Sequence, residues 1–407
     1  MKNKISLVAA FFLFSFSVTF LHAQTAYVGE FFSNYVKVIN AATHTITDSI
    51  YIGHMVEWTA VSPDGSKVYF VGADTVTVVN TASKSIIAKI PVGYDASGIV
   101  VSPDGSKVYV SNTLDYSVSV INTTTNSVDA TIPLGGGSPF DLAITPDGSK
   151  VYVASTNMNN TVTVLNTINN SVITTLTVGY IPEFLCISPD GSKVYVANAG
   201  EESIYIINTS TNIVSDSFTV SGNPSAIEIS NDGAKLYIAF TNDAFVKVYN
   251  ATSKTIIDSV AVSPDPHGLS LTPDGSKLYV ASLLHLDVIN VTSSTLIASI
   301  PMPNGPSAFG DFISTYPNVT GLIRSPAQQN AISVYPNPFS NQAIVTFEEE
   351  LNTATIQMKD VQGKTVKTIT SIQGRQVTIS KDELSRGVYF LQVIKSQNIF
   401  TKRVIIE

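Results

Sequence analysis

The chain has 407 residues, a formal net charge of −8, and 44% hydrophobic against 13% charged residues. This composition suits two domains of β-structure with large buried faces. The charge is uneven, because residues 24–318 hold 24 acids against 11 lysines and no arginine, whereas residues 319–407 hold 7 acids against 10 bases. Binding of nucleic acids and phosphates depends on lysine and arginine, so we expect neither nucleic-acid partners nor phosphorylated substrates.

The first 23 residues have the pattern of a secretory signal peptide. Lys2 and Lys4 precede an apolar run from residue 5 to residue 20, and Ala23 supplies a small residue before the expected cleavage site. The run is shorter than the roughly 20 apolar residues that span a bilayer. We therefore expect export, a mature chain that begins at Gln24, and no transmembrane segment in that mature chain.

A turn sequence of the form SPDGSK recurs through the first three quarters of the chain. Its six copies begin at Ser62, Ser102, Thr145, Ser188, Ser230 and Thr272. The spacings are 40, 43, 43, 42 and 42 residues, a repeat length that encodes four strands per blade in β-propellers.

One repeat shows why its residues form such a blade. Pro146 presets the backbone for a tight turn, Asp147 caps the turn through its side chain, and Gly148 adopts the positive φ that other residues avoid. The surrounding segments are rich in β-branched residues, as half-buried strands require. The expected strands are LAIT, KVYVAS, TVTVLN and SVITTLTV.

The two ends of the repeat region complement each other. The third-strand motif, of the type VTVLN, occurs seven times, whereas the turn occurs six times. The chain enters at a second strand, Ala26–Phe31, and leaves through an isolated first strand, Ser307–Ser314. We therefore predict an all-β, seven-bladed propeller over residues 24–318, in which the two terminal segments share one blade and remove the exposed edge. The alternative is an open β-solenoid, which requires dissimilar capping repeats.

Two segments within these repeats carry a family resemblance. YVSN at Tyr109–Asn112 and YVAN at Tyr195–Asn198, each after SPDGSK, resemble the YVTN-type propeller repeats of bacterial and archaeal surface proteins. The resemblance covers nearly all of residues 24–318. It implies the fold and leaves the function open, since propellers serve as binders, scaffolds and enzymes.

A different pattern follows the repeats. Residues 319–331 have the composition of a linker, and residues 332–407 contain short alternating strands that predict a small antiparallel β-sandwich. This region resembles the type A (Por-type) C-terminal sorting domain of the Bacteroidetes type IX secretion system. The resemblance implies passage across the outer membrane and removal of the tag, followed by release or attachment to surface lipopolysaccharide. An accessory binding sandwich is the alternative. The segments that carry the resemblance are YPNP (335–338), DVQGK (360–364), LSRGVYFLQV (384–393) and KRVII (402–406).

The candidate binding residues lie in the loops that join the fourth strand of one blade to the first strand of the next. In propellers these loops gather around the central channel and meet ligands. They predict a polar pocket with an aromatic rim for a carbohydrate, a peptide or another neutral to cationic ligand, and the alternative is that they are ordinary solvated loops. The candidates are His54, Glu57, Trp58, Tyr94, Asp95, Phe140, Asp141, Tyr180, Glu183, Asp265 and His267.

Motifs for metal, cofactor or catalysis are not found. The histidines 54, 267 and 285 lie in different blades without a ligand spacing, so we expect no metal site. The aspartates of the repeated turns are explained by turn capping without calcium. Cys186 lies in an apolar strand, which predicts a buried, inert thiol. We expect no cofactor, although Glu57 and Glu183 are a conceivable acid and base pair across the channel.

These observations favour a secreted or cell-surface propeller that acts as a binding module without catalysis and is exported through the type IX secretion machinery by residues 332–407. The alternatives are a propeller enzyme, lactonase-like or glycan-active, with carboxylates in its channel, and a structural surface-layer component. An enzyme requires at least two charged residues that converge in one pocket, whereas a binder can spread its polar groups over the rim.

Overall fold

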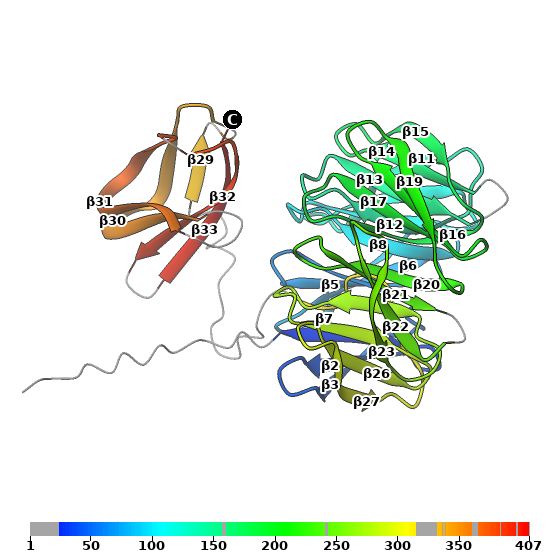
Figure 1. The fold of residues 1–407 in the computed structure, drawn as a ribbon. Coiled ribbons are helices and arrows are strands. Elements are labelled where there is room, and N and C mark those ends of the chain that lie inside the picture. The colour runs from blue at the N-terminus through cyan, green and yellow to red at the C-terminus, as the bar shows by residue number, and fades with distance from the viewer. Residues whose placement is uncertain are drawn as a thin grey trace, which may run out of the picture. The chain divides into compact units, whose positions relative to one another are not determined.

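The structure is a computed structural model that divides into two compact units, with the boundary between Val319 and Thr320 (Figure 1). Each unit is described by itself. The expected signal peptide, the linker and the DVQGK segment lie outside the described residues. The structure describes residues 24–156, 160–240, 243–314, 332–335, 337, 339–359, 365–382, 384–395 and 398–406.

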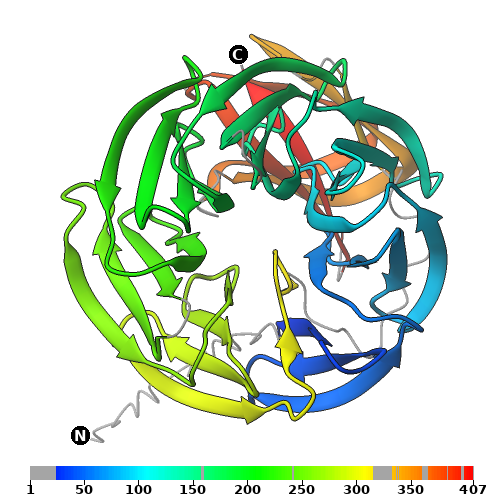
Figure 2. The same cartoon turned by 90° about the vertical axis from the view of Figure 1, so that its right-hand side faces the viewer.

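The first unit is a seven-bladed β-propeller, as predicted. Seven antiparallel four-stranded sheets stand in a ring (Figure 2). Six of them take four consecutive strands each. These are blade 2 (β4 Trp58–Val61, β5 Lys67–Gly72, β6 Thr75–Asn80, β7 Ser85–Pro91), blade 3 (β8 Ala96–Val101, β9 Lys107–Asn112, β10 Ser117–Asn122, β11 Ser127–Pro133), blade 4 (β12 Pro139–Ile144, β13 Lys150–Ser155, β14 Thr161–Asn166, β15 Ser171–Thr177), blade 5 (β16 Pro182–Ile187, β17 Lys193–Asn198, β18 Ser203–Asn208, β19 Ile213–Thr219), blade 6 (β20 Pro224–Ile229, β21 Lys235–Phe240, β22 Phe245–Asn250, β23 Ile256–Ala261) and blade 7 (β24 Gly268–Leu271, β25 Lys277–Ala281, β26 His285–Asn290, β27 Thr295–Pro301).

Blade 1 closes the ring with strands from both ends of the unit. Its order is β28 (Pro306–Ser307), β1 (Thr25–Glu30), β2 (Tyr35–Asn40) and β3 (Thr45–Tyr51). Gly29 of β1 pairs with Ser307, and further along the amide of Ser314 donates to the carbonyl of Thr25 at 2.8 Å. The predicted shared blade is confirmed.

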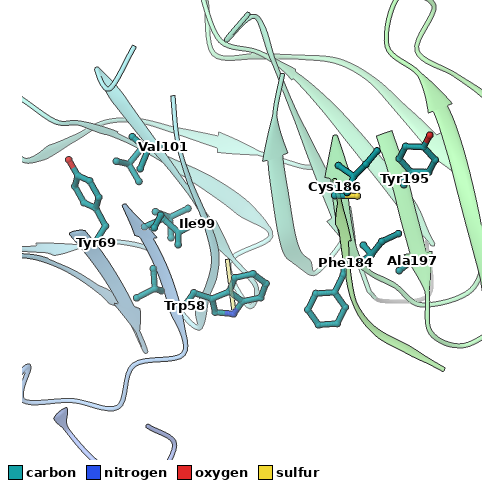
Figure 3. Packing of buried hydrophobic residues seen from close by; sticks show 14 of the residues in the cluster. Trp58, Tyr69, Ile99, Val101, Phe184, Cys186, Tyr195 and Ala197 are labelled. Atoms are coloured by element: carbon teal, nitrogen blue, oxygen red, sulfur yellow. The ribbon is translucent and has the colours of Figure 1, made fainter. Parts of the chain in front are cut away.

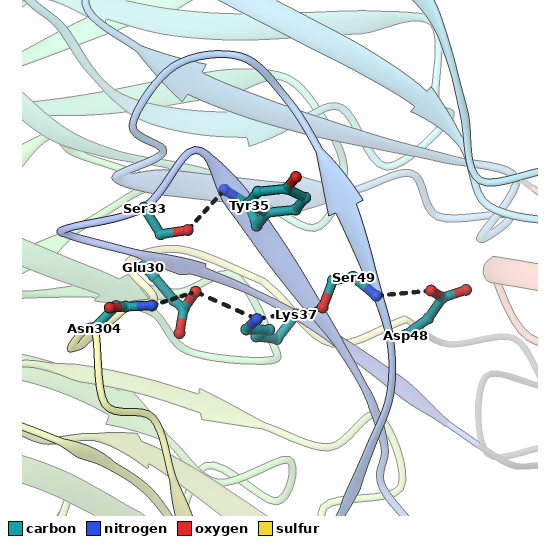
Figure 4. Close-up of polar contacts among 7 residues, drawn as sticks. All are labelled: Glu30, Ser33, Tyr35, Lys37, Asp48, Ser49 and Asn304. Atoms are coloured by element: carbon teal, nitrogen blue, oxygen red, sulfur yellow. Dashed lines mark hydrogen bonds and ion pairs between the residues drawn. The ribbon is translucent and has the colours of Figure 1, made fainter.

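The closing segment also reaches beyond its own blade. Asn304 donates from its side chain to the buried carboxylate of Glu30 at 3.4 Å, and Lys37 lies 3.5 Å from the same oxygen (Figure 4). After β28 the backbone bonds to β4 of blade 2, where the amide of Thr59 donates to Phe309 and that of Val61 donates to Asp311. The closing segment is therefore shared between two blades, and the carboxylate of Asp311 lies at the channel.

The repeated turn satisfies its own polar groups. In blade 4, the side-chain oxygen of Asp147 accepts hydrogen bonds from the hydroxyl of Thr145 at 2.5 Å and from the amide of Ser149 at 2.9 Å. Gly148 has a φ of 72°, which favours glycine. Burial alone raises the pKa of Asp147, but the hydrogen bonds outweigh it and hold this pKa below its usual value. The Asp-capped turn recurs in the other five repeats.

Neighbouring blades are joined by two repeated contacts. The first is a lysine at the start of the second strand. Lys107 of blade 3 donates to the carbonyl of Thr167 in blade 4 at 2.6 Å, and Lys150 of blade 4 donates to that of Thr209 in blade 5 at 2.6 Å. The second contact is a tyrosine two residues further on, which is fully buried in every blade, so its large ring fills the space between sheets. These tyrosines are Tyr27, Tyr69, Tyr109, Tyr152, Tyr195, Tyr237 and Tyr279.

The outermost strand of each blade is irregular. In all seven blades the pairing between the third and fourth strands shifts by one residue near the start of the fourth strand, for example between Val78 and Val79 opposite Ile86 and Ala88. Such β-bulges twist an exposed edge and hinder its pairing with another sheet.

The second unit is the predicted small antiparallel sandwich. Its strands are β29 (Ile332–Tyr335), β30 (Gln342–Lys359), β31 (Thr365–Ser380), β32 (Gly387–Lys395) and β33 (Asn398–Ile406), in the order β29-β30-β32-β33, with β31 paired to β30. Register shifts bend the long pair β30 and β31, and a bridge from Phe339 to Ile406 brings the two ends of the sheet together. The inner faces enclose one apolar core.

Candidate functional site

The propeller has two faces that differ in construction. We call the side that carries the repeated aspartate turns the turn face. The opposite side is the loop face, and it carries the loops from the fourth strand to the first strand of the next blade and those from the second strand to the third. The antiparallel order of the strands places both kinds of loop on that side.

The loop face carries exposed aromatic side chains. Within the described part of the propeller, every exposed aromatic residue lies in a loop or at a strand end of this face. Their exposed fractions range from 40% for Phe245 to 84% for Phe32. Only Tyr94 and Tyr180 of this set were sequence candidates. The members are Phe32, Tyr35, Tyr51, Tyr94, Tyr116, Tyr180 and Phe245.

Tyr94 is held in place through its backbone, so its ring can face solvent. Its amide donates to a carboxylate oxygen of Asp115 at 2.7 Å, and its carbonyl accepts from Leu114 at 3.3 Å. The amide of Gly93 donates to the side-chain oxygen of Asn112 at 3.0 Å. The tyrosine therefore stands on a rigid turn beside a carboxylate, and its ring is 64% exposed.

Tyr180 repeats this arrangement two blades away. Its amide donates to a carboxylate oxygen of Glu201 at 2.9 Å, and its carbonyl accepts from Gly200 at 3.0 Å. A Cβ on Gly179 would lie 2.7 Å from the side chain of Asn198, and one on Gly93 would lie 2.5 Å from that of Asn112. Both sites therefore require glycine before the tyrosine. We call these two sites the tyrosine clamps.

The two histidine candidates point into the protein. His54 lies with its ring nitrogens 2.9 Å from the carbonyl of Met55 and 2.9 Å from the hydroxyl of Thr77. His267 lies 3.0 Å from the carbonyl of Asp265 and 2.9 Å from that of Pro306 in the closing strand. Both histidines thus tie loops to the frame.

The two carboxylates considered as a pair from the sequence, Glu57 and Glu183, are both half-buried. Burial and the neighbouring Asp95 raise the pKa of Glu57, whereas burial raises that of Glu183 without an acidic neighbour. Asp95 is therefore an acidic neighbour whose charge acts on Glu57.

Four aromatic rings pack together near the centre of the ring of blades. Trp58 of β4 is 2% exposed and stacks on Phe309 at 5.1 Å between ring centroids. Phe184 of β16 stacks on Phe309 at 5.9 Å, and Phe140 meets Trp58 edge-on at 5.5 Å. Figure 3 shows Trp58 and Phe184 facing each other from opposite sides. The candidates Trp58 and Phe140 thus belong to a packed cluster and not to an open rim.

A cavity of about 250 Å³ begins at this aromatic cluster. It extends along the first strands to Val101, Ile144 and Ile187 at their ends, toward the turn face. Most of its lining residues are apolar, but polar atoms make up the larger part of the surface that faces the cavity, and the lining includes Asp141, Glu228 and Asp311. Asp141 was a sequence candidate, whereas the other two were not.

The three carboxylates influence one another. Burial raises the pKa of Asp141 to about 7, against hydrogen bonds from the amides of Leu185 at 3.0 Å and Leu142 at 2.8 Å. Burial, followed by repulsion from Asp311 and Asp141, raises the pKa of Glu228 to about 8. Partial desolvation by the channel wall also raises the pKa of Asp311, although this residue is exposed. These three carboxylates therefore hold their protons to a higher pH than ordinary carboxylates do.

An alignment of the repeats within the sequence shows Glu228 as an exception at its position. It stands two residues before the turn serine, where other blades have small or apolar residues such as Ala60, Ala143 and Cys186. Cys186 is buried beside the cavity, and burial raises the pKa of its thiol well above the usual value, in agreement with the predicted inert thiol. Across the described ranges, no group of three His, Cys, Asp or Glu residues has a geometry suited to a metal ion.

Two families match parts of the chain. Residues 333–407 match the secretion system C-terminal sorting domain, and residues 74–182 match the family described as lactonase, seven-bladed β-propeller. The chain is thus a seven-bladed propeller followed by a sorting domain, which marks it for export. No curated protein matches the chain.

Solved structures resemble the propeller in fold. A hydrazine synthase of Kuenenia stuttgartiensis has a TM-score of 0.57 and 20% identity, covering 62% of this chain and 88% of its own. A functionally unknown protein from Desulfotomaculum acetoxidans has a TM-score of 0.63 and 19% identity, covering 72% of this chain and 99% of its own. At this identity the likeness extends to the fold alone. Among the described residues no helix has the length and apolar character needed to cross a membrane.

Proposed function

We propose that the protein is an exported binding module that recognises its ligand with the loop face of the propeller. The observation that carries this proposal is the placement of all exposed aromatic residues of the described propeller on that face. Exposed aromatic groups in such number are characteristic of interaction sites, because solvating large apolar rings is unfavourable. The turn face, in contrast, is built of nearly identical, internally hydrogen-bonded turns.

An array of glycans and peptides tests this proposal. A triple variant, Phe32→Ser, Tyr51→Ser and Phe245→Ser, removes three of these rings without touching the buried frame. Ile168→Ser on the turn face is the control, since Ile168 is 86% exposed. We expect the triple variant to lose the ligands that the unaltered chain and the control retain. Equal binding by all three proteins would contradict the role of the loop face.

We propose that export uses both ends of the chain. Residues 1–23 act as a signal peptide, residues 319–331 as a linker, and residues 332–407 as a tag for the type IX secretion machinery, after which the propeller is released or held at the cell surface. The match of residues 333–407 to the sorting family supports this route. A chain truncated after Asn330 is expected to stay in the periplasm, and its normal appearance outside the cell would refute the tag.

A second candidate function is catalysis in the central cavity. The observation that favours it is that Asp141 and Glu228, with pKa values of about 7 and 8, both line one cavity. The partial match to a lactonase family points in the same direction. A panel of unphosphorylated lactones tests it. If the protein is an enzyme, the unaltered chain turns over one of these lactones, and Asp141→Asn or Glu228→Gln abolishes that turnover. If the unaltered chain turns over none of them, the binding module remains the proposed function.

A further inference from the structure

The two tyrosine clamps share one construction and the residues that build it, which are VGY at residues 92–94 and 178–180 and N-x-x-D/E at residues 112–115 and 198–201. In both, the tyrosine amide is bonded to a carboxylate of the loop between the second and third strands. The residue after the tyrosine has a φ of 56° at Asp95 and 54° at Ile181, in the left-handed region, which is unusual for the β-branched Ile181. Two repeats therefore hold a tyrosine in the same way, and both tyrosines are exposed.

The surroundings of both clamps are acidic and carry no compensating cation. Asp95 and Asp115 lie exposed at the first clamp, and Glu201 and Glu202 at the second. None of the four forms an ion pair within the described part of the chain. Elsewhere on the loop face, Lys247 lies 3.2 Å from Asp243, whereas the exposed Asp74 forms no ion pair within the described residues. The negative charge at the clamps is therefore available to a ligand.

We propose that the two tyrosine clamps form a paired recognition site for lysine or arginine side chains of a basic peptide segment. An exposed aromatic ring beside a carboxylate binds an ammonium or guanidinium group by cation–π and charge attraction together. The propeller, with 24 acids against 11 lysines, attracts such a partner from a distance. This inference rests on the proposed binding role of the loop face and names the chemistry of its ligand.

The pairing of the clamps adds a second expectation. The clamps lie in blades 3 and 5, separated by one blade, and each holds the backbone of its tyrosine by a hydrogen bond to a carboxylate. A segment that reaches both binds the second clamp at a high effective concentration, so the two sites reinforce each other.

Calorimetric titration of the full chain tests the proposal with two probes, a peptide of alternating lysine and glycine and a neutral glucan oligosaccharide. Tyr94→Ala and Tyr180→Ala remove the rings and leave the net charge unchanged. Asp115→Asn and Glu201→Gln remove the charges but keep an oxygen that accepts from the tyrosine amide. Ile168→Ala on the turn face is the matched control for an exposed apolar side chain.

We expect the lysine peptide to bind and the glucan not to bind. Each tyrosine variant is expected to weaken the peptide about two- to five-fold, and the double variant about ten-fold or more. Asp115→Asn with Glu201→Gln is expected to weaken it to a similar extent, whereas Ile168→Ala leaves it unchanged. If the tyrosine variants bind the peptide as tightly as the unaltered chain does, net charge alone explains the attraction and the proposal is overturned. The absence of peptide binding would also overturn it.

One outcome separates this inference from the proposed function. In this outcome the glucan binds, its affinity falls in Tyr94→Ala and Tyr180→Ala, and its affinity is unchanged in Asp115→Asn with Glu201→Gln. The loop face then binds sugars. The basic-peptide assignment would then be wrong while the binding role of the loop face stands.

Discussion

The turn face and the loop face are built at opposite ends of the same strands, yet they use their polar groups in opposite ways. On the turn face, aspartates such as Asp147 and Asp190 accept hydrogen bonds from the serine or threonine and amide groups of their own turn. On the loop face, carboxylates such as Asp115 anchor a tyrosine of another loop and leave its ring in solvent. The turn face is thus self-contained, whereas the loop face presents groups outward.

This difference teaches how a repeat protein divides stability from recognition. The turns, the buried tyrosines and the lysines that join blades recur with little change, and they hold the ring. Because the frame is held there, each loop of the opposite face can vary at little cost in folding free energy. Substitutions at the two faces should therefore affect different properties.

The largest expected effect comes from breaking the frame at its closure. Deletion of residues 307–314 removes the partner of β1 and exposes the edges of two blades. We expect the cooperative unfolding transition to be lost, with several kcal/mol of stability. Calorimetry measures this, and an unchanged melting profile would count against a closed ring.

Removing turn caps is the next largest effect. The double substitution Asp104→Ala and Asp190→Ala leaves amides of Ser106 and Ser192 without their acceptors in two separate blades. Each loss costs about 1–2 kcal/mol, and distant sites add, so we expect about 2–4 kcal/mol. Denaturant unfolding measures the difference, with the asparagine pair as a milder control. A cost below about 0.5 kcal/mol would show that the turns do not hold the frame.

The cavity carboxylates predict a dependence of stability on pH. The folded-state pKa of Glu228 is raised to about 8, so the native state retains a proton that the unfolded chain releases at lower pH. Stability therefore falls as the pH rises from about 4.5 toward 8. As the pH rises from 5 to 9, we expect the free energy of unfolding of Glu228→Gln to increase by on the order of 1 kcal/mol relative to that of the unaltered chain. Screening by water in the channel reduces this difference. Thermal melts with Glu202→Gln as the surface control measure this, and parallel pH profiles would contradict it.

The smallest expected effect sharpens the comparison from the other side. Tyr94→Ala and Tyr180→Ala remove mostly solvent-exposed rings from turns that are held through backbone bonds. We expect the free energy of unfolding to change by less than about 0.5 kcal/mol per substitution. Denaturant titration of the double variant checks this, and a loss of more than about 2 kcal/mol would mean that the rings are part of the frame.

The sequence was sufficient for the fold, because a turn such as SPDGSK acts locally and a repeated local signal defines a blade. It was less informative for the site. Trp58 and Phe140 were expected in loops, but they lie at the start of strands β4 and β12 and pack inward. Trp58 stacks on Phe309, which lies far along the chain and reaches it through ring closure. Asp311 lies in the same closing segment. Position in a repeat does not determine which way such a side chain points.

The closure of the ring has a consequence for the timing of export. Strand β1 begins at Thr25, but its partner β28 begins at Pro306, so nearly the entire propeller separates the two. While the chain emerges from its amino terminus onward, the early blades have a free edge that only the last propeller residues can cover. The finished circle can therefore form only after those residues have arrived, immediately before the sorting domain.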